Sequence, residues 1–336
     1  MIVIPRIANV TLKRFSCKLN RPMHVRSCLS DCKKAAKLID GKKIAQEIRT
    51  EVKAQVEEWV KQGHRNPCLI AILVGEDPAS EKYVANKMIA AKEVGINSQT
   101  IRLPNTTTES EVIDKIHKLN HDSSVDGILV QLPVPAHICE RNVCNAVDPL
   151  KDVDGFHTTN IGRLTLNTDT FVPATALAVY ELIKRYKIDT FGKNVVVCGR
   201  SKNVGLPIAI LLHSDANNEL PGCEATVTIC HRHTPPEELA FFAKRADIII
   251  SATGVVNLIK PEMVKPGACI IDVGITRITT ENGKTKLVGD VDFEGVSKIA
   301  GYITPVPGGV GPMTVAMLMF NTYKAAKHTI HSICSE

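Results

Sequence analysis

A serine, a tyrosine and a lysine are spaced so that one helix could bring their side chains together. They are Ser80, Tyr83 and Lys87, in the stretch DPASEKYVANKMIAAKEVGI that runs from Asp77 to Ile96. Residues three and four positions apart lie on the same face of a helix. A hydroxyl, a phenol and an ammonium group on such a face could hold a polar substrate, although the same pattern is also typical of a solvated face.

The sequence also marks the ends of this helix. Asp77 is placed to accept hydrogen bonds from the first turn, and Pro78 suits the first helical position. Gly95 suits the position just past the last turn. The three polar residues are therefore predicted to belong to one continuous helix.

Two further polar features lie in the same half of the chain. Gln131 falls at the carboxyl end of a predicted strand, GILVQL, where ligands bind in open α/β sheets. Asp152 and Asp154, in KDVDGFH, could form a paired-carboxylate or metal site, but an acidic loop with a glycine is also typical of an ordinary turn. From the residues alone, both interpretations remain open.

A candidate phosphate-binding loop lies in VVVCGRSKNVGLP, residues 195–207. A predicted buried strand ends at Gly199, and a helix begins near Gly205 with Pro207 in its first turn. Free backbone N–H groups and the positive end of a helix dipole could bind a pyrophosphate there. The glycine spacing differs from the usual G-x-G-x-x-G, so a plain strand-to-helix turn remains the alternative.

The residues around this loop bear on the choice of cofactor. NAD-binding folds usually place an acidic residue after the second strand, but here that strand ends in TVTICHRH, with Arg232. Arg200 in the glycine loop could join Arg232 around one anion, and Glu224 is the nearest acidic residue. Taken alone, this positive charge favours NADP.

A second glycine cluster, TPVPGGVGPMT, runs from Thr304 to Thr314. Its glycines and prolines force a tight connection from a strand to a helix, with Pro312 suited to the first helical turn. Glycine would let the backbone approach a ligand closely, and a purely structural turn is the alternative.

These motifs must be positioned by the elements around them, and strands and helices alternate along the chain. Predicted strands begin near residues 69, 98 and 127, and again near 194, 225, 247 and 268. Predicted helices at 41–61 and 174–186 open the two halves, and PLKDVDGFHTTNIGRL separates them. Such alternation predicts βαβ units, parallel sheets and an α/β fold.

Length and composition fit a globular protein of two domains. The chain has 336 residues, of which 44% are hydrophobic and 23% charged. No apolar run approaches the roughly 18 residues needed to cross a bilayer, so we expect a soluble protein with no membrane partner. Eleven cysteines without a CxxC pair indicate reduced thiols, because several lie within or beside apolar runs.

The net charge of +6 resides entirely in the first 30 residues, which contain no Asp or Glu. The basic residues there are Arg6, Lys13, Arg14, Lys18, Arg21 and Arg26. Because the remainder of the chain is neutral, we expect no nucleic-acid partner. An acid-free basic leader is typical of a mitochondrial transit peptide, and a disordered basic tail is the alternative.

Five of these stretches, in this order, resemble the methylenetetrahydrofolate dehydrogenase/cyclohydrolases. They are ASEKYVANKMIAAKEVGI, GILVQLPVP, KDVDGFH, GRSKNVGLP and TPVPGGVGPMT, and the resemblance extends from Leu38 to Lys327. It implies two α/β domains, the second a Rossmann-like dinucleotide-binding domain, with the active-site cleft between them. The implied division is a transit peptide at 1–34, a folate-binding catalytic domain at 35–172 and an NAD(P)-binding domain at 173–311, with a final helix at about 312–330 packing back on the catalytic domain.

The resemblance also implies two reactions and a role for each site residue. A hydride would pass from 5,10-methylenetetrahydrofolate to a nicotinamide, and the methenyl product would be hydrolysed to 10-formyltetrahydrofolate. Lys87 would activate the folate and water, Tyr83 would stack on the folate, Gln131 would tune the lysine, and Asp154 would hold the pterin. The other implied substrate-binding residues are Ser80, Leu132, Pro307, Gly308 and Gly309, and the implied cofactor-binding residues are Gly199, Arg200, Ser201, Val204, Gly205, Arg232, Thr253, Gly254 and Ile275.

Within the family, the segments around Arg200 and Arg232 resemble the mitochondrial NAD-dependent branch. In that branch inorganic phosphate and magnesium take the place of the 2′-phosphate of NADP, which revises the preference for NADP. Glu224 stands where the resemblance implies an aspartate as the magnesium ligand. We therefore expect a mitochondrial matrix homodimer that uses NAD, with NADP use or a non-catalytic folate- or nucleotide-binding protein as the alternatives.

Overall fold

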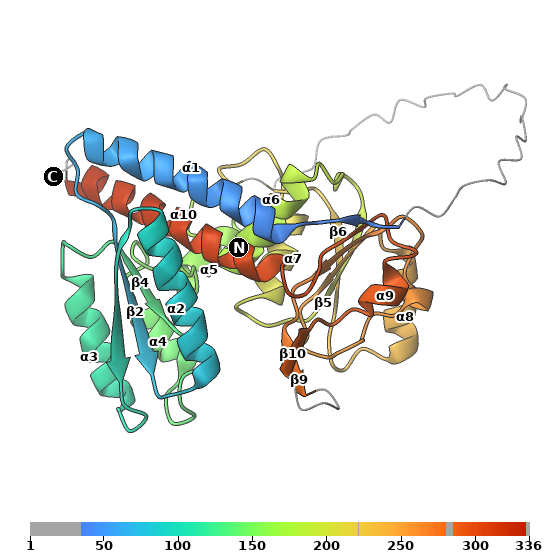
Figure 1. Ribbon diagram of the computed structural model, residues 1–336, viewed down its shortest axis with the longest axis horizontal. Helices are drawn as coiled ribbons and strands as arrows, with labels where there is room; N and C mark the ends of the chain where they lie inside the picture. Colours follow the sequence, from blue (N-terminus) through green and yellow to red (C-terminus); the bar gives the residue numbers. More distant parts are fainter. Residues whose placement is uncertain (1–34, 221, 280–284, 334–336) are drawn as a thin grey trace, which may run out of the picture. The chain divides into compact units, whose positions relative to one another are not determined.

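Two parallel sheets, each with helices packed against it, and one antiparallel pair of strands make up the described part of the chain (Figure 1). The computed structural model describes residues 35–220, 222–279 and 285–333. The predicted transit peptide, residues 1–34, lies outside them. Among the described helices, none combines the length and the apolar character needed to cross a membrane.

The first sheet has three parallel strands in the order β3 (Asn97–Leu103), β2 (Cys68–Val74) and β4 (Gly127–Val130). The central strand β2 is buried almost throughout, as its continuous apolar run predicts. The helices of this half are α2 (Pro78–Glu93), α3 (Glu109–Asn120), α4 (Glu140–Ala146) and α5 (Thr158–Thr165). Because β4 ends at Val130, Gln131 follows it at the carboxyl edge of the sheet.

The second sheet has six parallel strands and confirms the predicted α/β class. Their order is β1 (Lys37–Leu38), β11 (Tyr302–Ile303), β8 (Cys269–Asp272), β7 (Ile248–Ser251), β5 (Asn194–Cys198) and β6 (Thr226–Cys230). The helices of this half are α6 (Ala174–Arg185), α7 (Gly205–His213), α8 (Pro236–Arg245) and α9 (Phe293–Val296), with a 3₁₀ turn at Pro261–Met263. An antiparallel pair, β9 (Thr276–Thr279) and β10 (Thr285–Val288), projects from this sheet.

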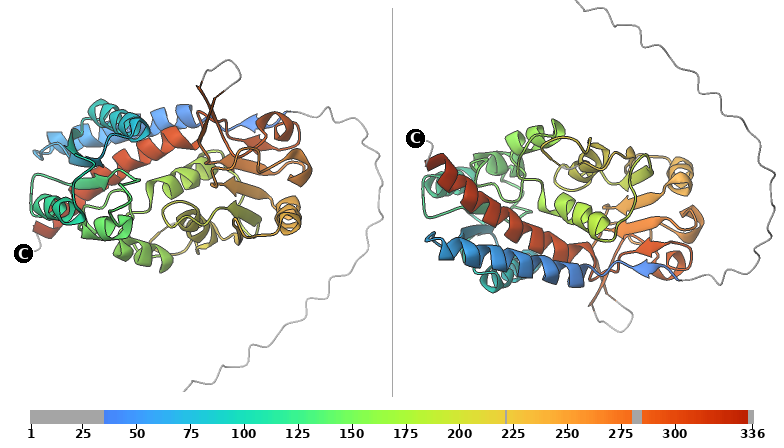
Figure 2. Two further views of the ribbon diagram at one scale, coloured as in Figure 1. Left: turned by 90° about the horizontal axis from the view of Figure 1, so that it is seen from below. Right: turned by 90° about the horizontal axis from the view of Figure 1, so that it is seen from above.

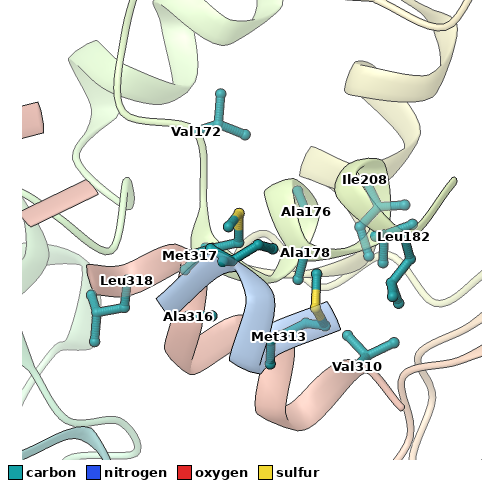
Figure 3. Packing of buried hydrophobic residues seen from close by; sticks show 14 of the residues in the cluster. Val172, Ala176, Ala178, Leu182, Ile208, Val310, Met313, Ala316, Met317 and Leu318 are labelled. Carbon is teal, nitrogen blue, oxygen red and sulfur yellow. The ribbon is translucent and has the colours of Figure 1, made fainter. Parts of the chain in front are cut away.

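Two long helices connect the halves. Helix α1 (Gly41–Lys61) and helix α10 (Val310–Ile333) run side by side in every view (Figures 1 and 2). Helix α10 also packs against α6 and α2, so it contacts both halves. Figure 3 shows this core, to which α10 contributes Val310, Met313, Ala316 and Met317, α6 contributes Ala176, Ala178 and Leu182, and α7 contributes Ile208.

The described chain from Ala35 onwards forms one compact unit. The predicted domain limits at residues 172 and 311 therefore stay a prediction. One detail differs from them, because β1 belongs to the second sheet although it precedes the first. The cysteines in the described ranges are all free thiols, in agreement with the expected reduced state.

Gly41, the first residue of α1, lies against the second glycine cluster. The amide of Lys42 donates a hydrogen bond to the carbonyl oxygen of Gly308 at 3.0 Å. A Cβ atom at position 41 would overlap the carbonyl oxygen of Gly309. The close approach of two backbones requires glycine at this position. Backbone conformation does not, because the φ angle of Gly41 lies outside the left-handed region.

We expect Gly41→Ala to destabilise the protein although alanine is the better helix former. The helix preference for alanine is about 0.5–1 kcal/mol, whereas forcing atoms into a packed contact costs about 1–3 kcal/mol. Urea unfolding followed by circular dichroism should show a lower free energy of unfolding. The control is Gly162→Ala within α5, where a Cβ would meet nothing within 4 Å. This variant should have a higher free energy of unfolding than the wild type. Equal changes in the two variants would contradict the contact as the cause.

Candidate active site

The polar face of α2 is partly buried. Asp77 accepts a hydrogen bond from the amide of Ser80 at 2.8 Å, Pro78 begins the helix and Gly95 follows its end, as the sequence predicts. Ser80 is only 4% exposed, whereas Tyr83 is 41% exposed and lies at the rim. The interpretation as a solvated face is therefore wrong for Ser80.

Lys87 is held by a residue from the first sheet. Its Nζ donates a hydrogen bond to Oε1 of Gln131 at 3.1 Å, and Nε2 of Gln131 donates to the carbonyl oxygen of Leu132 at 2.7 Å. Because the amide nitrogen is engaged by Leu132, the amide oxygen faces the ammonium group. Gln131 thus fixes the direction of the lysine side chain.

The two aspartates of KDVDGFH have different surroundings. Asp152 is buried and accepts hydrogen bonds from the amides of Gly155 (3.1 Å) and His157 (2.7 Å) and from Nδ2 of Asn160 (2.9 Å). Burial raises the pKa of Asp152 to about 6, against the opposing effect of these hydrogen bonds. Because all these bonds go to its own loop and to the first turn of α5, Asp152 fixes the path of the loop into that helix.

Asp154 faces the lysine instead. Asp152 pairs with Ile128 of β4 in parallel register, so the loop carries Asp154 toward the carboxyl end of that strand. Burial raises the pKa of Asp154 above its ordinary value, and the positive charge of Lys87 partly opposes this effect. Lys87, Gln131 and Asp154 therefore form one group, which we call the lysine cluster.

A pocket of about 410 Å³ is lined by Lys87 of this cluster and by residues of the second sheet's half. Tyr83 and Lys87 line one side of it. The predicted cofactor-binding residues Ser201, Val204, Gly254 and Ile275 line the other side. Residues that the sequence interpretation missed complete the wall: Thr175, Ala252, Val273, Gly274, Val310, Gly311, Thr314 and Val315.

A second pocket, of about 550 Å³, lies over the carboxyl ends of β5 and β6. Five predicted cofactor-binding residues line it: Gly199, Arg200, Ser201, Arg232 and Thr253. The tight turn of this loop requires both glycines, because Gly199 has a φ of +113° and a Cβ at Gly205 would overlap the carbonyl oxygen of Gly199. A turn of this kind occurs in dinucleotide-binding loops. Since Ser201 and Ala252 line both pockets, the two adjoin, and we call them together the cofactor groove.

Other predicted substrate-binding residues are not among the lining of these pockets. Leu132 follows Gln131 in the loop after β4, and Pro307 is exposed. Gly308 and Gly309 are buried beneath the start of α1, with Gly308 at a φ of +115°. The substrate-binding roles of these residues stay predictions.

Glu224 does not fit the proposed anion site at Arg200 and Arg232. The amide of Gly192 donates to the carbonyl oxygen of Glu224, and the side chain of Glu224 accepts from the amide of Ala216, so Glu224 lies at the amino end of β6. Arg200 and Arg232 follow the carboxyl ends of β5 and β6. The five residues of β6 span about 16 Å, and this length separates Glu224 from Arg232. A magnesium ion on Glu224 could therefore not touch an anion bound by these arginines. Within the described ranges, no cluster of three His, Cys, Asp or Glu residues could hold a metal ion.

Comparison with known proteins identifies the family. Residues 39–154 match the catalytic domain, and residues 173–330 the NAD(P)-binding domain, of tetrahydrofolate dehydrogenase/cyclohydrolase. The chain belongs to this family.

Individual relatives are similar over most of their length. A mitochondrial bifunctional methylenetetrahydrofolate dehydrogenase/cyclohydrolase of Drosophila melanogaster is 60% identical over 87% of this chain and 95% of its own. The chicken protein of the same name is 58% identical over 91% of both chains. The structure of a 5,10-methylenetetrahydrofolate dehydrogenase from the silkworm, Bombyx mori, matches with a TM-score of 0.84 and 57% identity, over 88% of this chain and 99% of that one.

The raised pKa of Asp154 leads to a prediction about stability. A carboxyl group whose pKa is higher in the folded protein destabilises the fold above that pKa and has no such effect below the unfolded value. Asp154→Asn should therefore raise the free energy of unfolding at neutral pH and leave it nearly unchanged at about pH 3, below the ordinary pKa of an aspartate. Urea titrations at both pH values measure this difference.

A matched control is Asp114→Asn, on the exposed face of α3, which should change stability little at either pH. Loss of stability in Asp154→Asn at neutral pH would show that the attraction to Lys87 outweighs the effect of burial.

Proposed function

We propose that this chain oxidises 5,10-methylenetetrahydrofolate with NAD and hydrolyses the methenyl product to 10-formyltetrahydrofolate. The observation that carries the proposal is the shared pocket, where Tyr83 and Lys87 face residues of the glycine loop and of the strand ends beside it. A hydride donor on one wall and an acceptor on the other would then be in contact. The names of the relatives support both activities and a mitochondrial location for this chain.

Geometry makes the main contribution to the first step. The nicotinamide, when bound, supplies the hydride acceptor, and the protein holds the folate methylene carbon close to it. Positioning two reactants in this way can contribute roughly 7–11 kcal/mol. Tyr83 would stack on the folate and Asp154 would accept hydrogen bonds from the pterin, with Ser80, Leu132 and the backbone at Pro307 to Gly309 completing the folate site.

Hydrolysis needs a group that handles protons. Water adds to the methenyl carbon and loses one proton to give a hydroxyl group. The bond from that carbon to N5 then breaks as N5 gains a proton, and the hydroxyl group loses its remaining proton to become the formyl carbonyl. Lys87 is placed to move these protons because Gln131 orients its ammonium group and Asp154 faces it. General acid–base catalysis of this kind contributes about 10²–10⁴-fold in rate.

The cofactor preference rests on Arg200 and Arg232, which line the same pocket. Two guanidinium groups could bind the 2′-phosphate of NADP, or inorganic phosphate beside the ribose of NAD. The resemblance to the mitochondrial branch favours NAD with phosphate. We do not assign magnesium to Glu224, which lies at the other end of β6.

The homodimer is proposed from an exposed edge of the second sheet. Strand β6 ends the strand order of this sheet, and its Ile229 is 39% exposed. Unprotected strand edges are natural surfaces for association with a second chain. A two-fold dimer would bury this edge.

We expect Lys87→Met to lower the methenyl hydrolysis rate by about 10²–10⁴-fold at saturating folate. Loss of folate binding alone would raise KM for both reactions and leave kcat intact. Loss of 5,10-methenyltetrahydrofolate absorbance in stopped flow measures the hydrolysis, and NADH formation measures the oxidation. Lys92→Met, at the exposed end of the same helix, is the control. Full cyclohydrolase activity in Lys87→Met would remove Lys87 from the mechanism, and absence of both activities in the wild type would favour a non-catalytic binding protein.

The cofactor proposal predicts that inorganic phosphate stimulates the NAD-dependent rate and that Arg232→Gln abolishes this stimulation. The control Arg245→Gln removes one positive charge from the far end of α8 and should keep it. Initial rates with NAD and with NADP, each with and without phosphate and magnesium, provide the measurement. NAD activity that is indifferent to both ions would refute the phosphate site, and faster turnover with NADP would establish the alternative.

A further inference from the structure

The turn after strand β7 forms the wall that the two parts of the cofactor groove share. Ala252 lines both pockets, Thr253 lines the one over β5 and β6, and Gly254 lines the one that contains Lys87. The glycine loop leans on the same turn, since a Cβ at Gly199 would overlap the carbonyl oxygen of Ala252. The position of this turn therefore sets the path of a dinucleotide through the groove.

One buried carboxylate oxygen holds the turn in place. Oδ2 of Asp290 accepts hydrogen bonds from Oγ of Ser251 (2.9 Å), the amide and Oγ1 of Thr253 (2.7 and 2.8 Å) and the amide of Gly254 (3.3 Å). Asp290 is fully buried, and it comes from the segment between β10 and α9, far along the chain from the turn. It lines neither pocket, so it touches a molecule bound in the groove only indirectly, through the turn that it holds.

A second buried aspartate fixes Asp290 itself. Oδ1 of Asp272, the last residue of β8, accepts from the amides of Asp290 (3.1 Å) and Gly274 (3.0 Å), and Oδ2 accepts from the amide of Val291 (2.9 Å). The space around the two carboxylates is filled, since a Cβ at Gly274 would overlap Asp290 and one at Gly289 would overlap Asp272. Asp290 therefore has little freedom to turn away.

We propose that Asp290 is a positioning residue for the nicotinamide cofactor, which acts by fixing the turn Ala252–Gly254 between the two halves of the cofactor groove. This inference rests on the proposed function. The proposed role predicts different effects on the two reactions, because hydride transfer needs the dinucleotide and methenyl hydrolysis does not. Loss of Asp290 should therefore weaken cofactor binding and oxidation and spare hydrolysis, whereas a purely structural role would lower both in parallel.

The test compares Asp290→Ala and Asp290→Asn in the full chain. Asp290→Ala leaves the donors of the turn without their acceptor and should raise Kd for NADH, measured by nucleotide fluorescence, and KM for NAD by at least about tenfold. Asp290→Asn keeps an oxygen for the turn but makes only neutral hydrogen bonds, so the increase should be smaller, about two- to fivefold. In both variants the kcat/KM of methenyl hydrolysis should stay within about twofold of the wild type, since the lysine cluster is untouched.

The control is Asp292→Ala, two residues further along the same segment. Asp292 caps α9 by accepting from the amide of Gly295 at 3.1 Å, and none of its hydrogen bonds reaches the turn. This variant should lose thermal stability and keep the wild-type Kd for NADH.

Three results would overturn the proposal: an unchanged Kd for NADH in the Asp290 variants, a parallel loss of both activities, or an equal loss of cofactor binding in Asp292→Ala. Should Asp290→Ala fail to fold, Asp290→Asn decides by the same two measurements. Failure of the proposed function is recognised separately, because the wild type would then lack one of the two activities.

Discussion

The packing of α10 against α1, α6 and α2 is the constraint on which the rest of the structure depends. The candidate site takes its residues from two sheets, and α10 contacts elements of both. Met313 and Ala316 are fully buried in this core, while neighbouring residues of the same helix, Thr314 and Val315, line the pocket that contains Lys87. A hydride can cross only a short gap, so a helix that joins the two walls by close packing suits this chemistry.

Local patterns predicted the elements of this fold well. The apolar run of β2 was sufficient to predict that strand, and the Asp-Pro start of α2 was sufficient to predict where that helix begins. Both signals depend on residues close in sequence. The bond between Lys87 and Gln131 joins residues 44 positions apart, and spacing along one helix cannot show it. Agreement among several separate motifs, by way of the family resemblance, was needed to bring the two together.

The harder cases involve residues of the same type in nearby positions. Asp152 and Asp154 look equivalent in KDVDGFH, yet one turns into its own loop and the other faces Lys87. Glu224 and Arg232 are near in sequence, but an extended strand separates them, which the strand length alone could have revealed. Asp290 was missed because an acidic residue beside a glycine is typical of an exposed turn, and only the folded chain shows it buried under the turn after β7.

The short strand β1 ties the start of the described chain into the second sheet. Lys37 and Leu38 pair with β11 in the second sheet, and the amide of Ala36 donates to the carbonyl oxygen of Ser297 at 2.8 Å. A processing peptidase that cut beyond Leu38 would remove one strand from the cofactor-binding sheet and shorten the approach to Gly41. The contacts of the second sheet with the start of the described chain thus extend back to Ala36, and the sheet keeps them only if Ala36 is retained.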